Sequence, residues 1–281
     1  MTATQAPALD TLEAVAARIR AHVVDMCAGP EGGHLGGAFS SVEVLTALYF
    51  SVLNVDPERP DDPDRDRFLL SKGHAAVALY ATLAERGFLP VEELAGYGRP
   101  GSRLMGHPVR AVPGVELPTG SLGHGLALAC GFALAHRTAG RDARSFVLLG
   151  DGELQEGSVW EAAIAAASLR LDRLVAVVDR NGLQLTGATD GIAPMEPLAD
   201  RWRSFGWAVR DVDGHDAAEL ADHLAAAPWE PGRPSVLIAR TVKGHGLPFL
   251  AGRAASHYVT LSPRNHARAR AALLRTTDAA G

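Results

Sequence analysis

Short apolar runs without polar alternation are the feature that most constrains the fold of this chain. Residues 146–149, 174–178 and 236–239 are such runs, and strands with this pattern are typical of a parallel sheet that is covered on both faces. An alanine-rich segment at about 158–169 separates the first two runs and is long enough to bring the chain back across a sheet. The pattern therefore predicts a βαβ unit.

Strand and helix signals continue on both sides of this unit. A strand is expected around residues 207–212, and a short helix at 217–227 leads to the last strand. Upstream, apolar residues recur at helical spacing over 12–26 and over 42–49, the second segment following a pair of serines. This alternation predicts the α/β class, with a doubly wound, mostly parallel sheet and helices on both faces.

No internal repeat or low-complexity linker divides the chain. The acidic, proline-rich stretch 56–66 reads as a surface connection, whereas the aperiodic stretch 97–121, rich in Gly, Pro and Arg, is a long loop of the kind that is usually functional or disordered. We expect residues 1–281 to form a single domain, with 264–281 as a terminal helix or tail.

Composition excludes several partner classes. The formal net charge is -5, and nucleic-acid binding demands a basic surface that this balance does not predict. Residues 1–10 lack a basic start followed by an apolar run, and no apolar window is long enough to cross a bilayer. Cys27 and Cys130 lie in helix-like apolar patterns, which favours buried, reduced thiols. We expect a cytoplasmic protein with no membrane partner.

Two polar turns follow neighbouring strands of the predicted unit. Gly150, Asp151 and Gly152 come after the first strand, and Asn181 and Gly182 follow the next. A right-handed crossover places these carboxyl ends side by side, where open α/β sheets bind ligands. Carboxylate, amide and carbonyl oxygens suit Mg²⁺ or Ca²⁺ rather than zinc. The glycines and the positive end of a helix starting nearby suit a phosphate, although either pair alone is also typical of an ordinary tight turn.

Histidine follows glycine unusually often. Six of the 11 histidines do so, namely His34, His74, His107, His124, His215 and His245. Glycine allows a ligand to approach, and imidazole can hydrogen-bond a phosphate or hydroxyl and transfer protons near neutral pH. Each single case is equally typical of a loop histidine with a local hydrogen bond.

Other catalytic signatures are missing from the sequence. It contains no HExxH or CxxC pairing, which argues against a zinc hydrolase, and no GxSxG elbow. The glycine-rich stretch 29–37 follows a predicted helix rather than a strand, so it does not fit a dinucleotide fingerprint.

A set of motifs resembles the transketolases. The run GDGELQEGSVWEA followed by DRNGLQLTG is similar to their thiamine diphosphate motif. The segments GGHLGG, DRFLLSKGHAA, GHP, TGSLGHG and TVKGHG match in the same order, from about residue 12 to residue 263. The resemblance implies a thiamine-diphosphate-binding fold, thiamine diphosphate with Mg²⁺ or Ca²⁺ as cofactors, and transfer of a two-carbon ketol unit from a ketose or ketose phosphate to an aldose.

The resemblance also implies roles for individual residues. Asp151, Asn181 and the carbonyl of Leu183 would hold the metal ion. The cofactor would contact Gly37, His74, Gly120, Ser121, Leu122, Asp151, Gly152, Asn181, Lys243 and His257. His34, His107 and His257 would face the reacting ketose, hydrogen-bond its hydroxyls and move protons. Glu156, in the same set, resembles a family glutamate at the contact between subunits; a solvated carboxylate at a helix start is its alternative reading.

The length of the chain implies a partner. Family members are usually about twice as long, so the chain resembles the N-terminal subunit of a split transketolase whose C-terminal, pyrimidine-binding half is a separate polypeptide. The expected assembly has two copies of each subunit, and the chain alone is expected to bind the cofactor weakly and to be inactive.

Two departures and two rivals accompany the resemblance. Leu35 and His124 replace the proline and glutamine that the family often has. A 2-oxo acid dehydrogenase subunit or deoxyxylulose-phosphate synthase shares the GDG and asparagine pattern but should lack the SKGH and GHP segments. A non-catalytic cofactor-binding module is the other rival, against which the intact metal and histidine positions argue.

Overall fold

The computed structural model describes residues 11–278, so the expectations for residues 1–10 and for the end of the tail at 279–281 lie outside the described residues. Within residues 11–278, no helix is both long and apolar enough to span a membrane.

The core is a five-stranded sheet in which every neighbouring pair is parallel. The spatial order is β1-β2-β3-β5-β4. The strands are β1 (Arg67–Leu70), β2 (Ser145–Gly150), β3 (Leu174–Arg180), β4 (Ala208–Asp213) and β5 (Ser235–Arg240). Four of them confirm predicted strands. The apolar patterns did not predict β1, which pairs with β2 at one edge of the sheet.

Helices precede and connect the strands. The α-helices are α1 (Leu12–Cys27), α2 (Leu35–Phe39), α3 (Val42–Ala47), α4 (Ala76–Arg86), α5 (Gly125–Thr138), α6 (Gly157–Ser168), α7 (Thr189–Ile192), α8 (Leu198–Ser204), α9 (Ala217–Ala225) and α10 (Pro263–Asp278). A π-helical turn, η1 (Leu48–Val52), extends α3. The 3₁₀ turns are η2 (Gly73–Ala75), η3 (Val91–Gly96), η4 (Gly152–Gln155) and η5 (Ala254–Ser256).

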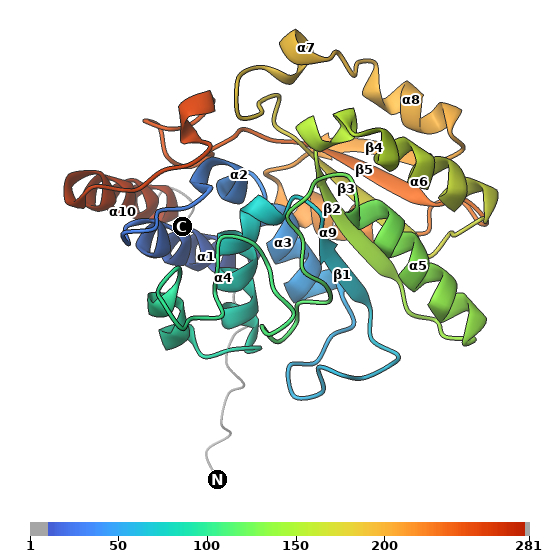
Figure 1. Cartoon of the computed structure of the whole chain (residues 1–281), viewed down its shortest axis with the longest axis horizontal. Helices are drawn as coiled ribbons and strands as arrows, with labels where there is room; N and C mark the ends of the chain where they lie inside the picture. Colours follow the sequence, from blue (N-terminus) through green and yellow to red (C-terminus); the bar gives the residue numbers. More distant parts are fainter. Residues whose placement is uncertain (1–10, 279–281) are drawn as a thin grey trace.

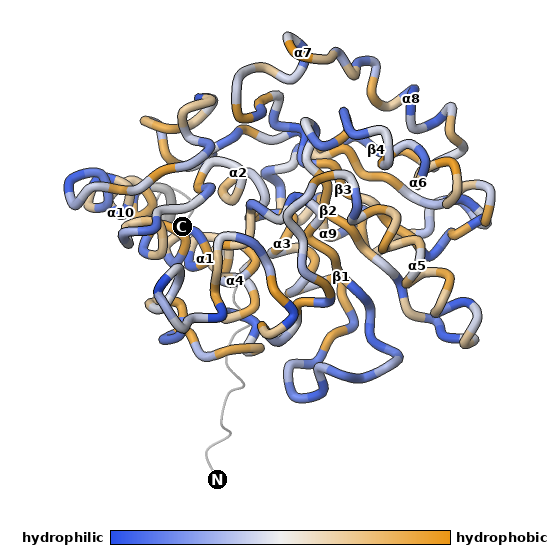
Figure 2. The backbone as a smooth tube through the Cα atoms, in the orientation of Figure 1, coloured by the Kyte–Doolittle hydropathy of each residue, from blue (hydrophilic) through white to orange (hydrophobic). Residues whose placement is uncertain are grey.

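Both faces of the sheet are covered, as the apolar runs predicted. Phe146 and Leu148 of β2 belong to a core shared with α1, α3, α4 and α9, whereas Val147 and Leu149 belong to a second core shared with α5, α6 and α8. The two helical layers lie on opposite sides of the strands (Figure 1). The tube through β1 to β3 is apolar, and the acidic loop before β1 is hydrophilic, consistent with a surface connection (Figure 2). The predicted doubly wound architecture is therefore confirmed.

The crossover through α6 brings the two predicted turns together. β2 and β3 are adjacent and in register, with Gly150 opposite Asp179. Because all strands are parallel, the segments that follow them emerge at the same edge of the sheet. Asp151 and Asn181 lie on neighbouring segments at this edge.

The serine pair before α3, Ser40 and Ser41, does not cap that helix. Ser41 occupies the N-cap position without a side-chain capping bond. The Ser41 hydroxyl instead donates to the carbonyl of Gly37 at 2.8 Å, and the Ser40 hydroxyl lies 3.1 Å from the same oxygen. They hold the turn between α2 and α3, which is part of the site.

Candidate functional site

A cavity of about 320 Å³ opens at the carboxyl edge of the sheet. It is lined by Gly37, Lys72, His74, Gly120, Leu122, Gly150, Asp151, Gly152, Glu153, Asn181, Leu183, Gln184, Leu185, Thr186, Lys243 and His257. Most of the residues predicted to bind metal or cofactor are therefore gathered around one space.

Asp151 is the buried anion of this cavity. One carboxylate oxygen accepts the N–H of Gly152 at 2.8 Å, and the other accepts the N–H of Gly182 at 2.6 Å and lies 3.3 Å from Nη1 of Arg180. Burial and the nearby Asp179 raise the pKa of Asp151 to about 6. A carboxylate that burial penalises in this way is one that a bound cation stabilises.

Asn181 and Leu183 present the other predicted metal ligands. The amide of Asn181 donates to Asp179 at 3.0 Å, and its oxygen accepts the N–H of Leu183 at 3.0 Å. The Leu183 carbonyl accepts from Nζ of Lys243 at 3.2 Å. Asp151 reaches this segment through the Gly182 N–H. A carboxylate, an amide oxygen and a carbonyl thus line one cavity, which is a donor set that suits Mg²⁺ or Ca²⁺.

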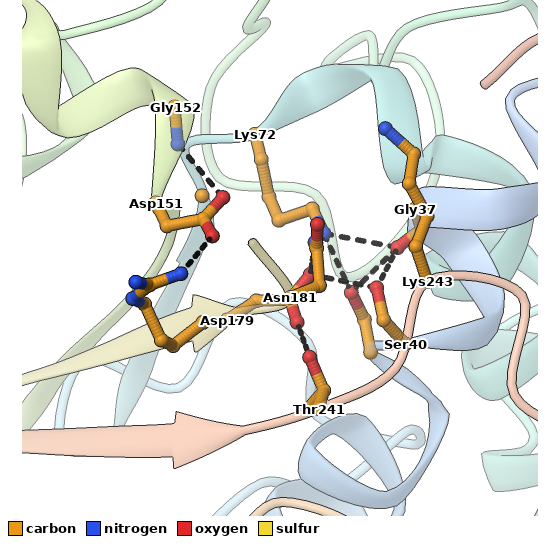
Figure 3. Close-up of polar contacts among 12 residues, drawn as sticks. Gly37, Ser40, Lys72, Asp151, Gly152, Asp179, Asn181, Thr241 and Lys243 are labelled. Carbon is orange, nitrogen blue, oxygen red and sulfur yellow. Dashed lines mark hydrogen bonds and ion pairs between the residues drawn. The ribbon is translucent and has the colours of Figure 1, made fainter. Parts of the chain in front are cut away.

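A buried ion pair that the sequence patterns did not predict lies beneath these ligands. Nζ of Lys72 forms an ion pair with the Asp179 carboxylate, and both side chains are at most 1% exposed. Asp179 also accepts from Ser40 at 2.7 Å and from Thr241, while Lys72 donates to the Gly37 carbonyl at 2.9 Å. Figure 3 shows these contacts joining the turn after α2 with the ends of β1, β3 and β5.

Lys243 and His257 form the positive side of the cavity. Nζ of Lys243 lies 3.0 Å from Nδ1 of His257, and Lys243 is 2% exposed. Burial and the neighbouring Lys72 lower the pKa of Lys243 to about 8. Burial and Lys243 lower the pKa of His257 to about 4. At neutral pH the pair is a cationic amine beside a neutral imidazole, an arrangement that suits an anionic ligand.

The predicted histidines form a cluster next to the cavity. The ring centre of His34 lies 5.4 Å from that of His74, 5.8 Å from that of His107 and 5.2 Å from that of His257. Burial lowers the pKa of His34 to about 4 and that of His74 well below its usual value. Neutral imidazoles can both donate and accept hydrogen bonds. Nδ1 of His34 is buried and has no hydrogen-bond partner among residues 11–278.

Some predicted residues lie elsewhere. Ser121 and Glu156 are exposed and do not line the cavity, whereas Gly120 and Leu122 of the TG segment do. The start of α6 does not line it either, because η4 intervenes. Of the two departures, Leu35 is buried in the core, and Nδ1 of the exposed His124 donates to the Leu122 carbonyl at 3.0 Å.

A second group of polar side chains could be taken for a metal centre. One ligand atom from each of Glu43, His215 and His245 lies within 4.8 Å of the others. However, Nε2 of His215 accepts the N–H of Val242 at 2.8 Å, which leaves the proton on Nδ1, facing Glu43 at 3.3 Å. Arg20 already forms an ion pair with Glu43. A metal ion would have to displace the Nδ1 proton and meet this cation, so the group is better described as a hydrogen-bonded network.

A larger cavity, of about 610 Å³, lies beside the first and is lined in part by Arg180, Glu196, Asp211 and Arg240. Its charges are already neutralised locally, because Arg180 pairs with Glu196 at 2.7 Å and Arg240 pairs with Asp211 at 2.7 Å. We place the chemistry in the smaller cavity, where buried ionisable groups converge.

Close backbone packing makes the smaller cavity fit a diphosphate. A Cβ on Gly37 would lie 3.2 Å from Nε2 of His74, and one on Gly152 would lie 2.8 Å from Oε1 of Gln184. Glycine at both positions keeps the backbone accessible to a ligand. Together with the oxygen donors, Lys243 and the unpartnered His34 nitrogen, these residues fit a metal-bound diphosphate with a hydroxylated ligand beyond it.

Comparison with known proteins finds a family whose description fits this site. Residues 11–276 match the family described as transketolase, thiamine diphosphate binding domain. The chain is 46% identical over 252 residues to one of the subunits of apulose-4-phosphate transketolase from Actinobacillus succinogenes, covering 89% of this chain and 91% of the relative. It is 45% identical over 231 residues to 6-deoxy-6-sulfo-D-fructose transketolase subunit SqwG from Clostridium sp. strain MSTE9, covering 82% and 84%.

Solved structures agree with the fold. The chain superposes on the transketolase from Leishmania mexicana with a TM-score of 0.88 at 32% identity, covering 95% of this chain and 42% of that one. The Campylobacter jejuni transketolase gives a TM-score of 0.85 at 30% identity, covering 93% and 42%. The chain therefore spans less than half of these solved transketolases.

Proposed function

Because this chain belongs to the transketolase family, we propose that it is the N-terminal, diphosphate-binding subunit of a two-chain transketolase. Its reaction is transfer of a two-carbon ketol unit from a ketose or ketose phosphate to an aldose. The observation that carries this proposal is the convergence of Asp151, Asn181, Leu183 and Lys243 on one cavity next to a histidine cluster. The nearly full-length matches to relatives that are named as transketolase subunits support it.

The residues of the cavity have distinct proposed roles. Asp151, Asn181 and the Leu183 carbonyl hold Mg²⁺ or Ca²⁺, with Arg180 and Lys243 giving up their contacts to Asp151 and Leu183. The proposed contacts to thiamine diphosphate itself are made by Gly37, His74, Gly120, Leu122, Gly152 and Lys243. When bound, thiamine diphosphate supplies the carbon nucleophile that carries the ketol unit.

The histidine cluster handles the sugar in this proposal. His34, His107 and His257 bind the hydroxyls of the ketose. The low pKa values of His34 and His257, about 4 each, keep both rings neutral at neutral pH. Each ring can then donate from one nitrogen and accept at the other. His34, with its unpartnered Nδ1, is positioned to accept and return a hydroxyl proton.

We also propose that a separate pyrimidine-binding subunit completes the site, with two copies of each chain in the assembly. An apolar face on α5 and α6 supports contact with another chain, because Leu128, Leu134 and Ile164 are 39%, 38% and 49% exposed there. Glu156 is the exposed N-cap residue of α6 and does not line the cavity, and we propose that it contacts the other chain. We keep the proposal that residues 1–281 form one domain. The cytoplasmic location stays a prediction.

The test is reconstitution. The purified chain is assayed for ketol transfer from ketose phosphates to aldoses, alone and mixed with a separate C-terminal transketolase chain, in the presence of thiamine diphosphate and Mg²⁺. Activity only in the mixture is expected. Turnover by the chain alone would refute the need for a partner, and an inactive mixture that binds the cofactor would favour a non-catalytic module.

A further inference from the structure

Glu153 is a buried carboxylate with no role so far in the proposed function. It is assigned to neither the metal, the diphosphate nor the sugar. It lies in η4, two residues after Asp151, and is only 2% exposed. A buried carboxylate is expensive unless its oxygens are hydrogen-bonded. The identity of its donors therefore indicates what it is there to hold.

The donors come from three separate segments of the cavity wall. One oxygen of Glu153 accepts the N–H of Gly123 at 2.9 Å and the hydroxyl of Ser71. The other accepts the N–H of Gly150 at 3.0 Å. Ser71 in turn accepts the N–H of Gly125 at 3.1 Å. The carboxylate thus joins the segment after β1, the segment before α5 and the end of β2.

Each of these segments carries residues assigned to the cofactor. His74 lies three residues after Ser71, Gly120 and Leu122 precede Gly123, and Asp151 and Gly152 follow Gly150. The residues around Glu153 are closely packed, since a Cβ on Gly125 would lie 2.3 Å from the Ser71 side chain. We therefore expect a change in these contacts to affect the cavity wall on three sides.

We propose that Glu153 is a positioning residue for thiamine diphosphate, holding these three segments at the spacing that the cofactor requires. The inference rests on the proposed function. Residues that hold metal ligands through hydrogen bonds typically contribute a factor of about 10 to 100 in metal affinity or activity, and we expect an effect of similar size here.

Glu153→Gln is the sharpest variant, because it keeps size and shape and replaces one acceptor oxygen with an NH₂ group. Whichever way the amide turns, its NH₂ faces the N–H of Gly150 or that of Gly123. Ser71→Ala removes one of the three links and serves where Glu153→Gln fails to fold. Glu58→Gln, at an exposed residue of the loop before β1, is the matched control. Leu220→Ala, in the buried face of α9, controls for general destabilisation.

The experiment measures the dissociation constant of thiamine diphosphate at saturating Mg²⁺, by calorimetry on the cofactor-free two-chain enzyme, together with the unfolding temperature without cofactor. Glu153→Gln is expected to weaken binding about 10- to 100-fold, with the apparent KM for the cofactor rising and kcat at saturating cofactor within a few-fold of wild type. Ser71→Ala is expected to change binding in the same direction, and both controls to bind like wild type.

A purely structural role predicts a different result. Glu153→Gln would then lower the unfolding temperature, as Leu220→Ala does, without changing the dissociation constant, and this outcome overturns the inference. Where Glu153→Gln does not fold, wild-type affinity in Ser71→Ala overturns it. Failure of the wild-type enzyme to bind thiamine diphosphate is a distinct result and overturns the proposed function instead.

Discussion

Lys72 and Asp179 are the most deeply buried charged pair at the site, with side-chain exposures of 1% and 0%. Their attraction has to offset the loss of water by both ions, so the pair contributes little net stability as long as both partners are present. Removing one partner leaves a buried charge. We therefore expect that neither residue can be replaced alone without a loss of stability.

Lys72→Met is expected to lower the free energy of unfolding of the cofactor-free chain by about 3 kcal/mol, because it leaves the Asp179 carboxylate without its cation. Urea unfolding monitored by circular dichroism measures this. The double variant Lys72→Met/Asp179→Asn removes both charges and is expected to recover more than half of the loss. A single variant that loses less than about 1 kcal/mol would show that Ser40, Thr241 and Asn181 satisfy the carboxylate by themselves.

Asp151 carries the second prediction at this scale. Asp151→Asn retains an oxygen that can accept the Gly182 N–H but loses the charge that a divalent ion needs. Thiamine diphosphate with Mg²⁺ is expected to raise the unfolding temperature of the wild-type protein, since a ligand that binds only the folded state stabilises it. This rise should be absent in Asp151→Asn and retained in Asp190→Asn, whose carboxylate is 54% exposed. An equal rise in the Asp151 variant would exclude this carboxylate as a metal ligand.

At the scale of elements, the ends of β4 and β5 meet α3 through His215, His245 and Glu43. The rings of His215 and His245 stack with centres 3.6 Å apart. Burial, followed by His215 and Arg20, lowers the pKa of His245 to about 4. His215 also accepts the Val242 N–H, next to Lys243. The network therefore helps to hold the segment after β5, which supplies Lys243 to the cavity.

The network should make stability depend on pH. The pKa of His245 is about 4 when folded and about 6.5 when unfolded. Between these values only the unfolded chain binds the proton, so this contribution is fully present above about pH 6.5 and is lost as pH falls toward 4. The difference in free energy of unfolding between wild type and His245→Gln is expected to change by on the order of 1 to 2 kcal/mol from pH 7 to pH 5.

Urea titrations of both proteins at the two pH values measure this difference. Histidines that do not contact His245 are present in both proteins and cancel, so the difference reports His245 together with its stacked neighbour His215. A difference that stays constant with pH would mean that His245 takes up its proton in the folded state.

Local patterns predicted four of the five strands and the helices α1, α3, α6 and α9, whereas β1, α4 and α5 were not predicted. The long apolar runs of β2 and β3 identify strands without help. β1 was missed because it is a four-residue strand whose run Phe68, Leu69 and Leu70 is too short to distinguish from a helix or loop. Its neighbours make it a strand by pairing with β2.

The residues of the site also divide into those that local patterns predicted and those that only tertiary contacts bring together. The turns at Asp151 and Asn181 could be placed together because a crossover rule relates strand ends. Lys72 and Asp179 are 107 residues apart in sequence, and Ser71 and Glu153 are 82 apart. No periodicity relates positions at such separations, so these supporting contacts appear only in the folded structure. The sequence predicted which residues gather at the cavity better than it predicted the buried contacts that hold them there.

At the scale of the whole molecule, the face formed by α5 and α6 is where another chain is most expected. Leu128, Leu134 and Ile164 are exposed there, and small residues on α5 (Ala127, Gly131 and Ala135) are exposed beside them. Small side chains allow helices to approach closely, and a face of this kind can pair with its own copy about a two-fold axis. The proposed assembly with two copies of each chain predicts a second copy of this chain at this face.

Ile164→Glu tests this arrangement, because it places a charge on the exposed apolar face of α6. Sedimentation of the chain mixed with its partner is expected to change from an assembly with two copies of each chain to one with a single copy of each. The unfolding temperature of the isolated chain should stay near that of wild type, since Ile164 is 49% exposed. Val91→Glu, at a residue of η3 that is 40% exposed, is the matched control and should leave the assembly intact. An Ile164→Glu protein that sediments like wild type would place the contact between copies on another face.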